Sequence, residues 1–394
     1  MKLSLRVMRK NMNLIKRLMS VLKVFGTILI ITFALLLLIE FSLSFLGWLE
    51  KNDKVDSRSK MSVYDNDWGE KFWQEYPNIV MSQSYKPFYL WAVNPAKSNY
   101  VNVDDNGNRR TINPNFNNIE KSEIKEVFIF GGSTVWGAGS PDSMTIASYL
   151  SEELNAQNLK FSVFNKGQPG HTQTQEIIQL ITLLKRGNRP DYVIFLDGAN
   201  DSSMSLINPK DAYSHLRFNH TRDVFNLDFA YLKMHYLGSL NLYQLALKIS
   251  QYGRESVPLN IVETNREKFL EESRTLINDA QDNIHTNYIL MQALSKAYDF
   301  KFRIFLQPTI ASKKDSLTSE EKIIWEKYRN DKVIFAYDAF HQMYKEFDFF
   351  RYPNLINISQ IFNGVSKTTF IDPVHYSPEG NQLLANEIAK FILK

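Results

Sequence analysis

Cysteine is absent from all 394 residues of the chain, so disulfide scaffolds, thiolate metal sites and cysteine nucleophiles are excluded. The sequence also lacks internal repeats and low-complexity tracts. Hydrophobic residues make up 44% and charged residues 22% of the chain, which are globular proportions and exclude disordered, collagen-like and coiled-coil classes. The length suffices for one large domain or two smaller ones.

Acidic residues are missing from the first 23 positions, which instead hold seven basic residues. These are Lys2, Arg6, Arg9, Lys10, Lys16, Arg17 and Lys23. The formal net charge of +4 belongs to this tail, because the 46 basic residues fall to 39 without these seven, against 42 acidic residues. A nucleic-acid partner is therefore not expected, since the remaining chain has no basic excess.

Charged side chains are also missing from residues 24–39, and Glu40 is the only one between Val24 and Leu49. A helix of about 20 apolar residues crosses the hydrocarbon core of a bilayer. The one-sided basic flank predicts a cytoplasmic tail over residues 1–23 and a membrane anchor over residues 24–49. Ser42-Leu43-Ser44 is a poor cleavage site, which favours an uncleaved anchor over a signal peptide. The alternative is a buried helix of a soluble protein.

Residues 50–126 show no long helical periodicity, and we predict an extracytoplasmic spacer followed by a segment that packs on the next domain. A pure linker would be poorer in aromatic residues. The aromatic residues are Tyr64, Trp68, Phe72, Trp73, Tyr76, Tyr85, Phe88, Tyr89, Trp91 and Tyr100. Packing is the commoner use of such side chains, and a strip that binds sugar rings is the alternative.

From residue 127 onward, short apolar runs alternate with helical patterns. The predicted strands are residues 127–130, 161–164, 192–196, 302–306 and 355–358. The predicted helices are residues 143–156, 172–185, 266–298, 320–328, 332–347 and 378–392. This alternation predicts an α/β fold of three layers, with a mostly parallel five-stranded sheet between helices. Residues 202–264 interrupt it as an insertion or cap, with an apolar helical stretch over residues 232–249.

The first predicted strand ends in Phe130-Gly-Gly-Ser-Thr-Val-Trp-Gly-Ala-Gly139. Glycines let the backbone turn sharply there, so the hydroxyl of Ser133 is presented at the sheet edge, where a nucleophile is placed. The phosphate-loop, dinucleotide and GxSxG patterns do not match this segment. A purely structural turn is the alternative.

Three further segments carry polar groups. Asn165-Lys-Gly-Gln-Pro-Gly-His-Thr172 and Leu196-Asp-Gly-Ala-Asn-Asp201 follow the second and third strands, where backbone N–H groups can face an anion. Phe370-Ile-Asp-Pro-Val-His-Tyr-Ser-Pro-Glu-Gly-Asn381 precedes the last helix. In it, Asp372 and His375 are three residues apart, so the carboxylate can orient the imidazole, although such a pair is more often structural.

Together these four segments resemble the sequence blocks of the SGNH (GDSL-type) hydrolase family over residues 127–394. The resemblance implies a flavodoxin-like fold and a triad of Ser133, His375 and Asp372. It also implies an oxyanion hole formed by Ser133, Gly170 and Asn200. The usual Gly-Asp-Ser is Gly-Gly-Ser here; the missing Asp is not the triad acid, so the departure concerns the subfamily and the loop geometry. With a membrane anchor, Phe-Gly-Gly-Ser-Thr resembles bacterial envelope members of the family.

The resemblance implies a serine esterase that hydrolyses an O-acetyl or other O-acyl ester outside the cytoplasm, on a free ester or an acylated glycan. The implied reaction requires no metal and no organic cofactor. If a sugar hydroxyl replaces water, the same residues make an O-acyltransferase. A third alternative is a membrane-tethered glycan-binding module without catalysis, in which the aromatic residues between 64 and 100 would bind sugar.

Other side chains carry weaker signals. His215 and His220, with Asp211 and Asp223, are possible metal ligands, but their spacing fits no strong motif and favours a polar surface. His171 is expected to line the pocket beside Gly170. Trp136 follows Ser133 closely and either shapes the acyl site or packs in the core.

Overall fold

The computed structural model describes residues 2–52, 56–64, 68–117, 119–156, 158–207, 213–227, 234, 236–245, 274–347 and 349–393. The chain divides into two compact units. One comprises Met1–Lys54 and His220–Leu259, and the other comprises Val55–Asn219 and Asn260–Lys394. We call the second the catalytic unit, because it contains the residues of the expected triad and oxyanion hole.

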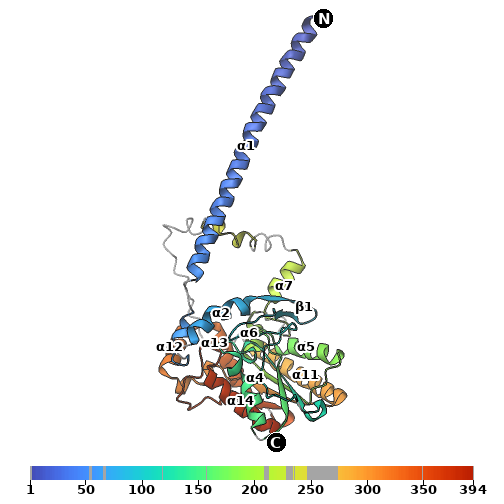
Figure 1. Ribbon diagram of the computed structural model, residues 1–394, viewed down its shortest axis with the longest axis vertical. Helices are drawn as coiled ribbons and strands as arrows, with labels where there is room; N and C mark the ends of the chain where they lie inside the picture. Colours follow the sequence, from blue (N-terminus) through green and yellow to red (C-terminus); the bar gives the residue numbers. More distant parts are fainter. Residues whose placement is uncertain are drawn as a thin grey trace. The chain divides into compact units, whose positions relative to one another are not determined.

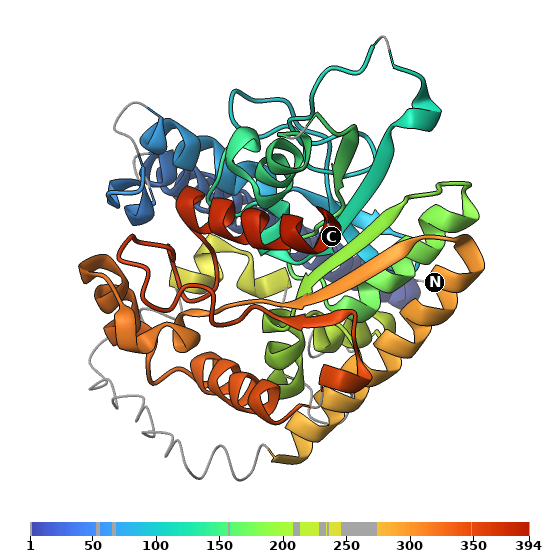
Figure 2. The same ribbon diagram turned by 90° about the horizontal axis from the view of Figure 1, so that it is seen from below.

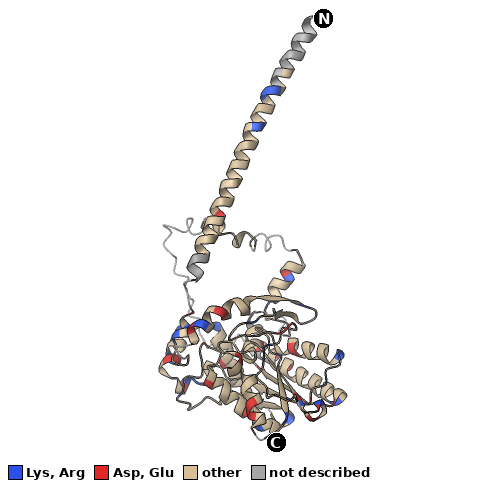
Figure 3. Cartoon of the chain, viewed as in Figure 1, with Lys and Arg blue, Asp and Glu red and all other residues tan. Residues whose placement is uncertain are grey.

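The first unit is dominated by helix α1 (Lys2–Asn52), which runs without interruption through the predicted tail and the predicted anchor (Figure 1). Its apolar stretch lies within Ile15–Gly47, where an 18-residue window reaches a mean hydropathy of 2.6, and it is long enough to cross a membrane. Figure 3 shows that the coloured part of this helix is almost entirely tan, which marks residues other than Lys, Arg, Asp and Glu. The predicted helix over 232–249 lies partly outside the described residues, and residues 236–238 and 241–245 of it are helical.

Residues 236–245 contact α1 at its single acidic side chain within the apolar stretch. The carboxylate of Glu40 accepts hydrogen bonds from the backbone N–H groups of Asn241 (2.8 Å) and Leu242 (2.7 Å). The side-chain amide of Asn241 donates to Glu40 (3.0 Å) and to the hydroxyl of Ser44 (2.9 Å). Three donor contacts therefore satisfy the Glu40 carboxylate, whose charge the apolar side chains around it would leave unsolvated.

The catalytic unit is built on the predicted five-stranded parallel sheet, in the order β4-β3-β5-β6-β7. Its strands are β3 (Lys125–Gly131), β4 (Phe161–Asn165), β5 (Tyr192–Asp197), β6 (Lys301–Leu306) and β7 (Leu355–Asn357). They are apolar on both faces, as a sheet covered on two sides requires. The prediction of an α/β fold with this sheet is confirmed.

Helices cover both faces of the sheet (Figure 2). Val127 and Ile129 of β3 pack toward α4 (Ile146–Asn155) and α14 (Pro378–Leu393). The alternate side chains of β3 pack toward α5 (Gln173–Lys185), α11 (Arg274–Tyr298) and α13 (Lys332–Glu346), because successive side chains of a strand point to opposite faces. Residues 266–273 of the predicted long helix lie outside the described residues.

The remaining elements are short. They are η1 (Ser57–Lys60), η2 (Lys121–Glu123), α3 (Ser133–Trp136), η3 (Asp142–Met144), α6 (Ala199–Ile207), α7 (Phe218–Phe225), η4 (Ile310–Ser312), η5 (Lys314–Ser316), α12 (Ser319–Tyr328) and η6 (Phe349–Arg351). Helix α6 begins within the third polar segment, where the sequence showed no helical pattern.

The segment before the sheet contains a helix that the periodicity did not predict. Helix α2 (Gly69–Met81) buries Phe72, Trp73 and Tyr76 and carries Pro77 in its interior. A proline inside a helical pattern normally marks its end, which explains why this helix was not predicted from the sequence. A two-stranded hairpin follows, formed by β1 (Gln83–Lys86) and β2 (Leu90–Val93).

The aromatic residues of this segment mostly serve packing. Tyr64, Phe72, Trp73, Tyr76, Tyr89 and Trp91 are buried. Tyr85 and Phe88 are exposed, with 72% and 76% of their surface accessible. A continuous aromatic strip open to a sugar is therefore not formed by the described residues of this segment.

A fully buried ion pair fixes the chain that leads to Asp372. The ammonium of Lys313 lies 2.7 Å from a carboxylate oxygen of Glu321, and neither side chain is exposed. Lys313 also donates to the carbonyl of Lys367 and the hydroxyl of Thr369, while Glu321 accepts the N–H groups of Thr369 and Phe370. Both charges are thus fully hydrogen-bonded to residues 367–370.

Replacing Lys313 by Met should lower the free energy of unfolding by about 3–5 kcal/mol, because it leaves the Glu321 carboxylate buried without its cation. Urea unfolding of the purified protein measures this loss. Lys314→Met is the matched control, since the Lys314 side chain is 41% exposed and its ammonium lies 3.7 Å from Asp338. Equal midpoints for the two variants would contradict a structural role for the buried pair.

Candidate active site

Ser133 lies where strand β3 passes into the short helix α3, at the carboxyl edge of the sheet. Gly132 precedes it, and the backbone of Gly132 lies close to the side chain of Asn200. A Cβ atom at position 132 would lie 2.2 Å from the side-chain nitrogen of Asn200, so any larger residue would displace Asn200. The glycine that the sequence suggested for a sharp turn thus also brings Asn200 next to Ser133.

Three predicted side chains form one hydrogen-bonded row. The hydroxyl of Ser133 lies 2.7 Å from Nε2 of His375, and Nδ1 of His375 lies 2.7 Å from Oδ2 of Asp372. The other oxygen of Asp372 accepts the backbone N–H groups of Val374 (3.1 Å) and His375 (2.8 Å). A nucleophile next to a base, with the base oriented by an acid, is the geometry of nucleophilic catalysis.

A residue that the sequence analysis did not single out contacts the acid of this row. Nη1 of Arg58 donates to Oδ2 of Asp372 at 2.8 Å. Burial by itself would raise the pKa of Asp372, but His375 and Arg58 outweigh it and hold that pKa well below its usual range. The carboxylate therefore stays ionised. No local pattern signals this contact, because 314 positions separate the two residues.

Gly170 lies in the segment that follows β4, and Asn200 lies at the start of α6, after β5. Gly170 has a φ of 79°, a conformation that favours glycine. The amide of Asn200 donates to the carbonyl of His171 at 2.7 Å, which fixes its orientation. Within the described part of the chain, the backbone N–H groups of Ser133 and Gly170 donate to no protein acceptor. Both remain able to bind a negatively charged oxygen.

The neighbourhood of Gly170 is formed by two segments outside the sheet. A Cβ atom at position 170 would lie 3.7 Å from the ring of Trp91 and 3.8 Å from Leu216. The indole N–H of Trp91 donates to the carbonyl of Pro169 (2.8 Å), and the guanidinium of Arg217 covers its ring at 4.3 Å. The β1–β2 hairpin and the start of the insertion therefore border the candidate oxyanion site.

Two residues near the predicted site are enclosed by protein. His171 is completely buried, Nε2 of its ring is hydrogen-bonded to the carbonyl of Trp91, and burial lowers the pKa of His171 to about 3. It is therefore a neutral packing residue. Trp136 is also completely buried, and Arg109 lies over its ring at 4.7 Å. Of its two sequence interpretations, the structure supports core packing.

The weak metal signal has no counterpart in the described residues, which contain no cluster of three or more His, Cys, Asp or Glu side chains able to hold an ion. His215 packs against Trp91 and Phe218. Asp223 pairs with Arg222 at 2.8 Å. Asp211 lies outside the described residues.

Three buried carboxyls lie within or shortly after the polar segments: Asp197 and Asp201 in the third, and Glu176 in α5 after the second. Burial raises the pKa of Asp201 to about 6 and raises the pKa values of Glu176 and Asp197 as well. Gln173 donates to this group through its backbone N–H (to Asp201) and its side chain (to Asp197). Because the folded-state pKa values are raised, their ionisation costs stability as the pH rises through the folded-state values.

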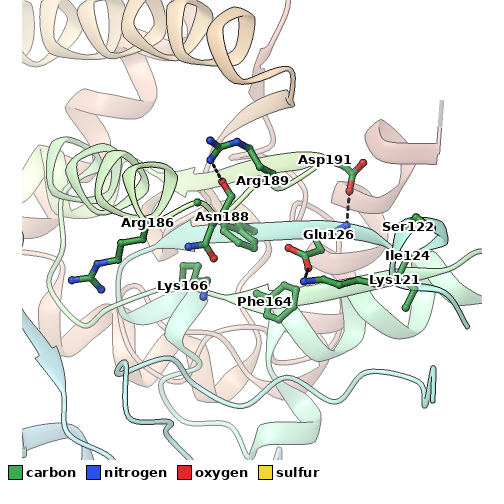
Figure 4. A pocket seen from close by; sticks show the side chains of 12 residues that line it. Lys121, Ser122, Ile124, Glu126, Phe164, Lys166, Arg186, Asn188, Arg189 and Asp191 are labelled. Atoms are coloured by element: carbon green, nitrogen blue, oxygen red, sulfur yellow. Dashed lines mark hydrogen bonds and ion pairs between the residues drawn. The ribbon is translucent and has the colours of Figure 1, made fainter. Parts of the chain in front are cut away.

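Cavities occur both beside Asp372 and away from the Ser–His–Asp row. A cavity of about 660 Å³ is lined by Asp372, Arg58 and the α12 residue Ile324, among others. Figure 4 shows another, of about 610 Å³, beside Phe164, Lys166 and Arg186. None of the predicted site residues lines the cavity in Figure 4, so we do not assign the chemistry to it.

A parallel α/β sheet with a Ser–His–Asp row at its carboxyl edge is the architecture of a hydrolase that uses a serine nucleophile. The model of the family described as "GDSL-like Lipase/Acylhydrolase" matches residues 127–388, about two thirds of the chain. The chain belongs to this family, and it is an enzyme of the ester-hydrolysing class. No curated protein sequence matches it significantly.

Solved structures of esterases are similar to the chain at low identity. An acetylxylan esterase from Geobacillus stearothermophilus is 15% identical, with 68% of this chain and 94% of the other covered and a TM-score of 0.33. A carbohydrate acetylesterase from Sinorhizobium meliloti is 12% identical (68% and 98% covered, TM-score 0.33). A psychrotrophic esterase from Pseudoalteromonas is 13% identical (68% and 100% covered, TM-score 0.33). These values carry no argument about the substrate.

Proposed function

We propose that the protein is a serine esterase that cleaves a carboxylic O-acyl ester, such as an O-acetyl group, outside the cytoplasm. The observation that carries this proposal is the position of His375, which contacts Ser133 through Nε2 and Asp372 through Nδ1. Ser133 is the nucleophile, His375 the general base and Asp372 the residue that orients the imidazole. Gly170 and Asn200 complete the oxyanion hole.

The reaction follows from these contacts. Nε2 of His375 takes the proton of Ser133 as the serine oxygen bonds to the ester carbonyl carbon, and Asp372 stabilises the resulting imidazolium. The oxyanion accepts hydrogen bonds from the N–H groups of Ser133 and Gly170 and from the amide of Asn200. The imidazolium then protonates the departing alcohol. A water molecule, deprotonated by His375, releases the acid from the serine.

Hydrolysis of p-nitrophenyl acetate and longer-chain esters tests the chemistry. Ser133→Ala and His375→Ala should each lower kcat by at least about 1000-fold, whereas Asn200→Ala should lower it by about 100- to 1000-fold by removing one oxyanion donor. The same assay with oligosaccharide acceptors separates hydrolysis from transfer, since an acylated acceptor identifies a transferase. Wild-type release no faster than that of Ser133→Ala would refute an esterase and favour a binding module.

We also propose that α1 is an uncleaved membrane anchor with its N-terminus in the cytoplasm. Three observations support this: the apolar stretch of α1 is long enough to span, seven basic residues precede its uncharged residues 24–39, and Glu40 is hydrogen-bonded by Asn241 and Leu242. Unpaired charges within an apolar span are costly, so the paired carboxylate is compatible with a position at the outer end of the span.

The absence of cysteine makes this topology directly testable. Phe350, fully exposed in the catalytic unit, and Met12, in α1 before the apolar part, each accept a single cysteine. A membrane-impermeant maleimide added to intact cells (spheroplasts, if an outer membrane is present) should label Phe350→Cys and spare Met12→Cys until the cells are lysed. If only Met12→Cys is labelled before lysis, the proposed orientation is wrong. If the catalytic unit is released into the medium, α1 is not an uncleaved anchor.

A further inference from the structure

The short helix η1 (Ser57–Lys60) follows the apolar helix by only a few residues, yet it contacts the acid of the triad. We propose that Arg58 is a positioning residue of the reaction, which holds Asp372 in the orientation that His375 requires. This inference rests on the proposed esterase function and adds a residue from outside the segment that matches the family, residues 127–388. Part of the active site would thus be supplied by the membrane-proximal chain.

The guanidinium of Arg58 is itself fixed from two sides. Asp56 accepts its Nε through Oδ1 (3.0 Å) and its Nη2 through Oδ2 (2.8 Å), a two-point contact that matches the planar fork of arginine. The ring of Trp73 lies against it, 4.2 Å from the guanidinium carbon. Nη1 is left to donate to Asp372 at 2.8 Å. The guanidinium therefore reaches Asp372 in a preset geometry.

The backbone that carries Arg58 is fastened to the same part of the catalytic unit. Glu320 of α12 accepts both the N–H and the hydroxyl of Ser62 (2.7 Å each) and the hydroxyl of Thr368 (3.0 Å). The hydroxyl of Tyr64 donates to the carbonyl of Gly139 at 2.9 Å. Glu320 thus connects the chain after η1 to the chain that leads to Asp372.

Asp372 is consequently bound on both of its oxygens. Oδ1 accepts the N–H groups of Val374 and His375, while Oδ2 accepts Nδ1 of His375 and Nη1 of Arg58. Without Arg58, one oxygen would lose its only partner outside the catalytic loop. Rotation of the carboxylate would then be less restricted, and a small misplacement of a catalytic group lowers the rate steeply.

Charge gives the proposal a second signature. Asp56 and Arg58 are the charged groups of η1 and its cap that face the triad acid. The neighbouring Tyr64, Tyr76 and Tyr337 add no charge, because burial raises their pKa values and they stay neutral. The cation of Arg58 opposes the positive charge that the imidazole gains on protonation. Removing it should favour the protonated imidazole and move the acidic limb of the kcat/KM profile to higher pH.

The experiment compares Arg58→Gln, Arg58→Lys and the matched control Arg303→Gln in the full-length protein, with p-nitrophenyl acetate. Arg303 is half-buried and bonded to Asn354, away from the triad. Arg58→Gln should lower kcat about tenfold with KM changed less than about twofold, because positioning is lost and binding is not. Its acidic limb should move to higher pH, because one positive charge near the imidazole is lost.

Arg58→Lys should keep the wild-type acidic limb but recover only part of kcat, since lysine retains the charge and lacks the fork. Asp56→Asn is the second variant if Arg58→Gln fails to fold, and it should lower kcat by a smaller factor, because Arg58 stays present but less fixed. Wild-type kcat and pH profile in Arg58→Gln, or equal losses in Arg303→Gln, would overturn the proposal. Turnover that persists in Ser133→Ala would instead refute the proposed function, whatever Arg58 does.

Discussion

The parallel direction of all five strands is the constraint on which the candidate site depends. It brings the carboxyl ends of β3, β4 and β5 to one edge of the sheet, and these strands are neighbours in the order β4-β3-β5. Ser133, Gly170 and Asn200 follow the three strands in turn. A slip of one residue in any pairing would exchange the two faces of that strand and move its following loop. Packing of the sheet and geometry of the site are therefore secured by the same contacts.

The proposed base His375 and acid Asp372 are not positioned at this edge by the sheet, because they lie on a loop with no strand directly before it. The loop obtains its rigidity from buried polar contacts. The Lys313–Glu321 pair binds residues 367–370 from one side, and Arg58 binds Asp372 from another. Such contacts are costly when half satisfied, so they restrict the loop to one arrangement. The short Ser133–His375 contact of 2.7 Å depends on that restriction.

Local patterns in the sequence were enough to predict the sheet, and the resemblance of the polar segments to a family singled out the residues of the Ser–His–Asp row. Each strand is a short apolar run that ends at a turn, and each polar segment stands next to such a run, so the order of the blocks could be predicted. Helix α2 could not, because Pro77 interrupts its pattern while Phe72 and Trp73 fill the core. Tertiary packing here overrides local propensity.

Contacts between residues far apart in the chain could not be predicted from the sequence. Arg58 lies 314 positions from Asp372, and Ser62 lies 258 positions from Glu320. Nothing in the local sequence around these residues identifies their partners. The packing role of Trp136 could not be chosen either, since its burial depends on Tyr76 and Arg109 from the preceding segment. The order of the blocks thus predicted the candidate reacting groups, whereas the side chains that hold them in place became visible only in three dimensions.

The central claim is that Ser133 is a nucleophile activated by His375. Reaction with a fluorophosphonate, followed by intact-mass and peptide mass spectrometry, tests it most directly, because the reagent bonds to an activated serine without requiring the natural ester. The account predicts one adduct per chain, on Ser133, with labelling absent in Ser133→Ala and strongly slowed in His375→Ala. An unlabelled wild-type protein, or an adduct on a different serine, would contradict it.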